Sequence, residues 1–186
     1  MSFIHSISQW LRVFPMVFSF LLSACVSQPN TQNFDKQQAA KARVELAFGY
    51  LQQQAFAQAK LNLDKALSYA PDYYLVHSAL GYFYQQQGDI EQARQSYQRA
   101  LKLDKKQGDV RNNYGALLCG QGDFSAAYEQ FEQALATPNY YHQADTYENI
   151  VLCALAQKNT ERYQQSLAAL QKLDAARAAK LSQLEQ

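Results

Sequence analysis

Cysteine and histidine are the residue types in this chain with the most specific chemistry, and the chain has three of each. They are Cys25, Cys119 and Cys153, and His5, His77 and His142. No two histidines stand at a metal-ligand spacing, so we expect no metal site, and we expect His77 to be a packed core residue. The sequence also has no phosphate-binding glycine loop, nucleophilic-serine motif or paired-carboxylate motif. We therefore expect no enzymatic activity, no cofactor and no small-molecule substrate.

Cys25 lies directly after an apolar run near the amino terminus. Residues Val13–Leu22 form that run, which at ten residues is too short to cross a bilayer, since a spanning helix takes about 20. The run leads into Leu22-Ser23-Ala24-Cys25, and small residues before a cysteine at such a place resemble the lipobox of bacterial lipoproteins. The resemblance implies that residues 1–24 are a signal peptide and that Cys25 is acylated. A plainly secreted protein, cut nearby, is the alternative.

The residue after Cys25 bears on the location of the protein. Val26 stands there, whereas an Asp would favour inner-membrane retention in enterobacterial-type sorting. The resemblance therefore implies a lipid anchor in the outer membrane, with the protein facing the periplasm. We interpret residues 25–39, which are mostly polar, as the lipidated cysteine and a tether.

The composition indicates a folded and mainly helical domain. Hydrophobic residues make up 48% of the chain and charged residues 18%, which is enough apolar side chain to bury a core. Glycine (7) and proline (4) are scarce, and this favours helix over sheet. The formal net charge is +1 and no basic stripe runs along the chain, which argues against nucleic-acid binding.

A repeat of 34 residues is the strongest pattern in the sequence. Shifting the chain by that period superimposes small and apolar residues from three blocks: Ala59, Ala93 and Ala127; Ala66, Ala100 and Ala134; and Leu67, Leu101 and Leu135. Gly88-Asp89 and Gly122-Asp123 also coincide, and a glycine followed by a capping Asp predicts a break between two helices. Each block is therefore expected to be a helix pair whose close crossing depends on the alanines.

This pattern of small and large residues resembles the tetratricopeptide-repeat (TPR) family. The resemblance implies an all-α solenoid of antiparallel helix pairs, with three clear repeats and a degenerate fourth. The expected repeats are residues 40–73, 74–107, 108–143 and 144–177. The fourth needs two extra residues in Pro138–Gln143, and Tyr163 stands where a small residue belongs. Residues 178–186 are expected to be the end of a final helix, with Leu181 and Leu184 covering the core.

Cys119 and Cys153 are themselves 34 residues apart. They fall in the first helices of neighbouring repeats, which pack side by side in such a stack. In an oxidising periplasm we expect a disulfide that joins the third repeat to the weaker fourth. Closing a loop of this length would stabilise the fold by about 3 kcal/mol on a chain-entropy model. Two buried free thiols are the alternative, because the extra residues before the fourth repeat shift Cys153.

The first helices of TPR repeats line a concave groove, and here we expect that surface to be apolar and rich in amides. The candidate protein-binding residues are Val44, Phe48, Leu51, Leu75, Ser78, Tyr82, Gln85, Asn112 and Asn113, with Ala116 beside them. Such a surface suits the apolar side chains of a bound peptide, while its amides can pair with the peptide backbone. Partial burial of Phe48 and Tyr82 against the adjacent helix is the alternative interpretation.

A narrower resemblance rests on four segments: Leu22–Cys25, Arg111–Cys119 (RNNYGALLC), Gln130–Tyr140 and Asn149–Cys153. Together they resemble the PilF/PilW family of type IV pilus biogenesis and stability lipoproteins. Members of that family act as pilotins, which help the pilus secretin to assemble in the outer membrane, or stabilise the fibre. The resemblance implies a protein partner, a secretin subunit, although family members have more repeats than the four expected here. A general periplasmic TPR adaptor for envelope or peptidoglycan machinery is the alternative.

Overall fold

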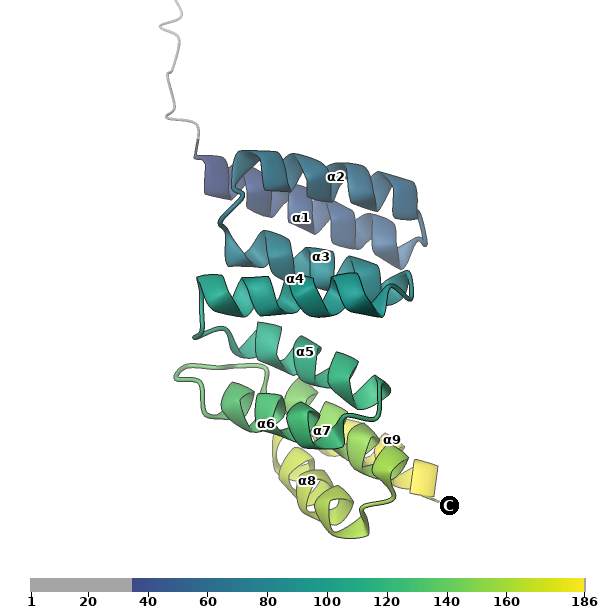
Figure 1. Ribbon diagram of the computed structural model, residues 1–186. Coiled ribbons are helices and arrows are strands. Elements are labelled where there is room, and N and C mark those ends of the chain that lie inside the picture. Colours follow the sequence, from purple (N-terminus) through teal and green to yellow (C-terminus); the bar gives the residue numbers. More distant parts are fainter. Residues whose placement is uncertain (1–34, 186) are drawn as a thin grey trace, which may run out of the picture. The chain divides into compact units, whose positions relative to one another are not determined.

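The computed structural model describes residues 35–185, and this part of the chain consists of nine α-helices and a short 3-10 helix (Figure 1). The helices are α1 (Lys36–Gln52), α2 (Phe56–Tyr69), α3 (Tyr74–Gln86), α4 (Ile90–Leu103), α5 (Gly108–Gly120), α6 (Phe124–Leu135), α7 (Gln143–Gln157), α8 (Thr160–Leu173) and α9 (Ala175–Leu181). The described residues contain no strand, so the all-α expectation is confirmed. None of these helices is long and apolar enough to cross a bilayer. The expected signal peptide, Cys25 and residues 26–34 of the expected tether lie outside the described residues. Residues 36–39, also expected to be tether, instead form the first turn of α1, which Asp35 caps.

Successive helices pair, and the pairs stack. α1 packs on α2, α3 on α4, α5 on α6 and α7 on α8, and the first helix of each pair also contacts the preceding pair. Figure 1 shows the pairs following one another along the stack from α1–α2 to α7–α8, with α9 beside the last pair. This arrangement is the TPR solenoid that the 34-residue repeat predicts.

The recurring alanines occupy like sites in the first three pairs. All six members of the two alanine columns are fully buried: Ala59, Ala93, Ala127, Ala66, Ala100 and Ala134. Two of the first helices, α3 and α5, have a glycine where a large aromatic ring of the second helix packs against them. A Cβ added at Gly81 would lie 2.7 Å from the ring of Tyr97, and one at Gly115 would lie 2.6 Å from the ring of Phe131. Larger residues at these glycines would therefore overpack the crossing.

The turn inside each pair contains one residue in the left-handed backbone region. Gly88 (φ +76°) and Gly122 (φ +78°) fill this place in the second and third pairs, as the sequence predicted. Gln54 (φ 57°) and Lys158 (φ 61°) fill it in the first and fourth pairs, where the side chain makes the conformation less favourable by about 1–2 kcal/mol. The Asp after each of the two glycines caps the next helix, also as expected.

The fourth pair crosses with larger residues than the other three. Tyr163 and Leu170 stand in the two alanine columns, and both are buried. They share a hydrophobic cluster with Ala178 and Leu181 of α9. The Tyr163 hydroxyl also donates a hydrogen bond to the backbone carbonyl oxygen of Leu181, at 3.3 Å. α9 thus covers the large residues of the last pair, where a further repeat would otherwise pack.

α9 is a short helix of its own, and residues 178–181 form its end, as expected for a final helix, whereas Ser182–Glu185 form a 3-10 turn. α8 ends at Leu173, and the Asp174 side chain then accepts a hydrogen bond from the Arg177 backbone N–H and starts α9. Of the two leucines expected to cover the core, Leu181 is buried. Leu184 is exposed, so the expectation for that residue is wrong: it belongs to the 3-10 turn Ser182–Glu185, beyond the cluster that Leu181 completes.

Candidate protein-binding surfaces

A disulfide joins the third helix pair to the fourth. Cys119 of α5 and Cys153 of α7 are bonded with their Cα atoms 5.8 Å apart, so the predicted bridge is confirmed. Cys119 is the twelfth residue of its repeat, whereas the two extra residues make Cys153 the tenth of its own. The shift still brings the half-exposed Cys119 against the buried Cys153 where α5 contacts α7. The bridge holds the first helices of these two pairs together.

The structure divides the predicted groove residues into two groups. One group is buried: Val44, Leu51, Ser78 and Asn112. The other group keeps part of each side chain accessible: Phe48, Leu75, Tyr82, Gln85, Asn113 and Ala116. Buried side chains can support a binding surface from beneath but cannot offer much area to a ligand. Direct contact with a partner therefore remains a hypothesis for the second group.

Phe48 of α1 and Tyr82 of α3 form the aromatic part of this surface. Their ring centroids are 5.7 Å apart with the planes inclined at 55°, and Phe48 remains 36% exposed. The partial burial that the sequence left open is therefore confirmed for these rings, because they pack on each other. Phe48 still presents area to solvent, and its contact with a partner stays a prediction. Beside them, the Gln85 side-chain oxygen accepts a 3.1 Å hydrogen bond from the Tyr97 hydroxyl, which fixes this amide.

The later first helices present carboxylates, and these already have basic neighbours. Arg177 of α9 pairs with Asp145 at 2.5 Å and with Glu148 at 3.0 Å, and the hydrogen bond to Asp145 raises the pKa of the Arg177 guanidinium. His142 Nδ1 lies 3.1 Å from a carboxylate oxygen of Asp109. The groove thus changes along the stack, from aromatic at α1–α3 to ion-paired at α5–α9.

The described tyrosines and His77 make contacts that support the fold. Burial raises the pKa of Tyr140 to about 12 and also raises that of Tyr97, so both remain neutral hydroxyls near neutral pH. His77 is half-buried, with Nε2 2.7 Å from the Pro71 carbonyl oxygen, so the expectation of a core position is wrong for this residue. Within residues 35–185, no group of three or more His, Cys, Asp or Glu could hold a metal ion.

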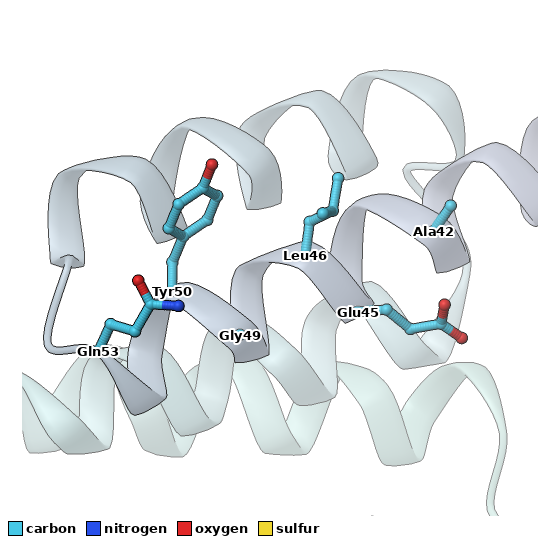
Figure 2. Close-up of a pocket in the computed structure, with 6 residues that line it drawn as sticks. All are labelled: Ala42, Glu45, Leu46, Gly49, Tyr50 and Gln53. Carbon is cyan, nitrogen blue, oxygen red and sulfur yellow. The ribbon is translucent and has the colours of Figure 1, made fainter.

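A further surface, which the sequence patterns did not predict, lies on α1. It is an open hollow of about 590 Å³ lined by Ala42, Glu45, Leu46, Gly49, Tyr50 and Gln53, and we call these six residues the α1 outer face. Figure 2 shows the side chains of Ala42, Leu46 and Tyr50 pointing to the same side of the helix. The repeat itself contained the signal, because the first pair of a stack has no preceding repeat to cover its first helix.

Comparison with known sequences agrees with the helix-pair architecture. The family model for the tetratricopeptide repeat matches residues 72–139. A Haemophilus influenzae protein, itself uncharacterized, is 55% identical over 170 residues, which cover 91% of this chain and 94% of the relative. The likeness therefore extends well beyond the segment that the repeat model matches.

Two solved structures are similar to the stack as a whole. PilF of Pseudomonas aeruginosa matches with a TM-score of 0.71 and 29% identity, over 81% of this chain and 70% of the PilF chain. PilW, a widely conserved type IV pilus biogenesis factor, matches with a TM-score of 0.68 and 25% identity over 73% of this chain. The matched part spans 62% of the PilW chain, so more than a third of PilW has no counterpart here.

Proposed function

The chain is a tetratricopeptide-repeat protein of the same family as the Haemophilus influenzae protein, and on this premise we propose that it is a scaffold for type IV pilus biogenesis. In the specific form of the proposal, it is an outer-membrane lipoprotein that acts as a pilotin for a secretin subunit, or that stabilises the pilus. The observation that carries the proposal is the likeness to PilF and PilW, which combines similar architecture with 29% and 25% identity.

The surfaces of the stack fit a role in binding protein. The α1–α3 part of the groove offers the adjacent rings of Phe48 and Tyr82 together with the fixed amide of Gln85. Exposed aromatic rings and side-chain amides suit the apolar side chains and backbone of a peptide.

The proposed anchor places the stack close to a membrane. Acylation of Cys25 in the outer membrane would leave nine residues between the anchor and Asp35, which caps α1. Such a segment reaches at most about 30 Å when fully extended. The test is metabolic labelling with a radioactive fatty acid: the wild-type chain should take up label, and Cys25→Ser should not. Equal labelling of both would remove the anchor from the proposal.

Deletion of the gene from the source bacterium tests the pilus function. We expect fewer secretin multimers in the outer membrane and fewer surface pili, both restored by the wild-type gene. Complementation with Phe48→Ala/Tyr82→Ala asks whether the aromatic part of the groove takes part. A matched control is Leu173→Ala, since Leu173 is also an exposed apolar residue but lies at the end of α8. Unchanged multimers and pili in the deletion strain would contradict the proposed function.

A second candidate function is that of a general periplasmic adaptor for envelope or peptidoglycan machinery. The observation that favours it is that the match spans only 62% of the PilW chain, so the likeness to a pilus protein is partial. Purification of the chain from cross-linked cells would separate the two candidates, since murein synthases or hydrolases, found in the absence of a secretin, would favour the adaptor.

A further inference from the structure

The centre of the α1 outer face, at Leu46 and Gly49, corresponds to positions that are buried in every later pair. Its central residue, Leu46, is 50% exposed, whereas Leu80 and Tyr114 at the same repeat position are 7% exposed and Ile150 is 4% exposed. The preceding pair supplies the cover. Tyr114, for example, packs against Tyr97 of α4 with ring centroids 5.9 Å apart. None of the residues that the structure describes covers Leu46 in this way.

Gly49 makes the α1 outer face hollow. The later pairs have large or medium side chains at this position, all buried: Phe83, Leu117 and Cys153. A Cβ added at Gly49 would meet no heavy atom within 4 Å. Glycine inside a helix is less favourable than alanine by about 1 kcal/mol, and no close approach among the described residues requires it here. The space at Gly49 could therefore receive a side chain from outside the stack.

Glu45 gives the α1 outer face a charge that the later pairs lack. The matching residues are Ala79, Asn113 and Asn149, none of which is ionised. Glu45 takes part in none of the ion pairs found among the described residues. A carboxylate at the edge of an apolar hollow favours a partner that combines apolar and basic side chains.

Two occupants from this chain, a second copy and residues 26–34, fit the α1 outer face poorly. In a two-fold pair of α1 outer faces, each Glu45 would approach the other copy's Glu45, and like charges would repel. Residues 26–34 (VSQPNTQNF) have a proline and mostly polar side chains, so this segment has no apolar stripe to fill the hollow. The stack itself shows what fits, because its own second helices cover this surface in the later pairs.

We propose that the α1 outer face binds an amphipathic, basic helix of another protein, which docks on α1 as the second helix of a preceding pair would. The apolar stripe of that helix lies over Leu46 and Tyr50, one of its side chains enters the hollow at Gly49, and a Lys or Arg pairs with Glu45. This inference concerns how the proposed scaffold binds and does not depend on the pilus pathway. Its test therefore uses no pilus protein.

Two helices of this chain serve as matched probes. The α4 sequence Ile90–Leu103 is basic, with Arg94, Arg99 and Lys102 against Glu91. The α6 sequence Phe124–Leu135 is acidic, with Glu129 and Glu132 and no basic residue. Both cover the matching surface of the next pair in the stack. Because isolated helices of this length are marginal in water, each would be synthesised with a side-chain staple and a fluorophore.

The experiment is a fluorescence-anisotropy titration of each probe with the full chain. We expect saturable binding of the α4 probe, and binding of the α6 probe that is at least about tenfold weaker. Leu46→Arg and Gly49→Gln should each lower the affinity for the α4 probe at least about tenfold. Glu45→Lys should reverse the preference, so that the α6 probe binds more tightly than the α4 probe. The control is Leu61→Arg: Leu61 is 55% exposed on α2, outside the α1 outer face, and its replacement should change nothing.

Several results would overturn the inference. One is failure of the α4 probe to bind, and another is an equal loss of affinity for the probe in Leu61→Arg and Leu46→Arg. A third is a wild-type dimer, seen by sedimentation, that the Leu46→Arg substitution dissociates. Gly49→Gln guards against a folding artefact, since a Cβ at this position meets no heavy atom within 4 Å and glutamine has a higher helix propensity than glycine. The inference fails if that variant is fully folded by circular dichroism and binds the α4 probe as well as the wild type does.

Discussion

The first and last helix pairs of the described stack differ in whether their end surface is covered by other residues of the chain. At the last pair, α9 covers Tyr163 and Leu170, and the Cys119–Cys153 bridge ties that pair to its neighbour. At the first pair, no described residue covers Leu46, and Gly49 leaves a hollow beside it. One pair has the features of a region built for stability, and the other has the features of a region that binds.

This difference shows how a repeat protein can change function without changing its fold. Each unit exposes an apolar helix face that its neighbour must cover, so the cover can come from a repeat, a short helix or another protein. At the last pair, Tyr163 and Leu170 stand in place of the recurring alanines, and α9 packs against them. At the first pair, Gly49 stands where the later pairs have a larger side chain, and this leaves a hollow on the surface.

The largest expected effect lies at the covered pair. Replacing Tyr163 with Ala removes a fully buried ring and its hydrogen bond to Leu181, so we expect the free energy of unfolding to fall by about 3–5 kcal/mol. Leu46→Ala, the matched change at the uncovered face, should cost less than about 1 kcal/mol. Urea denaturation followed by circular dichroism measures both. Similar losses in the two variants would abolish the contrast between the two pairs.

Reduction of the disulfide should have the next largest effect. Breaking the Cys119–Cys153 bond releases a long loop, and we expect the free energy of unfolding to fall by about 3 kcal/mol. Denaturation with and without dithiothreitol measures this, and the Cys119→Ala/Cys153→Ala variant should not respond to the reductant. Two reactive thiols in the denatured, unreduced, acylated protein would contradict the assignment.

The ion pairs around Arg177 should contribute less. They lie near the surface, so Arg177→Ala should cost about 0.2–1 kcal/mol, and added salt should reduce that cost. The pKa of Arg177 is raised in the folded protein, so its contribution is complete below the ordinary pKa of arginine and is lost only as the pH rises above it. Between pH 6 and 9 we therefore expect about the same loss, within roughly 0.3 kcal/mol. A steep change across that range would show that another group controls the contact.

The smallest expected effect on stability belongs to Leu46→Arg. Because Leu46 is half exposed and no described residue packs over it, the free energy of unfolding should change by no more than about 0.5 kcal/mol. The same substitution should nevertheless weaken the α4 probe strongly. Measuring unfolding and probe binding on one preparation separates the two roles. A loss of stability above about 2 kcal/mol would mean that the face is part of the core.

The periodic features of the fold could be predicted from the sequence because they repeat. Alanines at a 34-residue spacing indicated the helix crossings, and two cysteines at the same spacing indicated the bridge. Gly88 and Gly122 likewise predicted the turns inside their pairs. Gln54 and Lys158 adopt the same left-handed backbone without glycine, which only the alignment of the repeats could suggest.

The features at the two ends of the stack were harder to predict because they do not recur at the 34-residue period. The start of α9 depends on a single capping residue, Asp174, and the exposure of Leu184 follows from the turn after that helix. Groove contact was predicted from repeat position alone, which could not distinguish the buried Val44 from the accessible Phe48. The α1 outer face was missed for a related reason, since its residues look like ordinary core residues until the cover is seen to be absent among the described residues.

The contrast between the two pairs can be tested most directly by hydrogen–deuterium exchange of the full chain with and without the α4 probe. Amide exchange reports local opening, so a docked helix should slow exchange where it binds. We expect added protection in α1 and little change in α7, α8 and α9. Protection concentrated in α8 and α9, or none in α1, would contradict the assignment of binding to the uncovered pair.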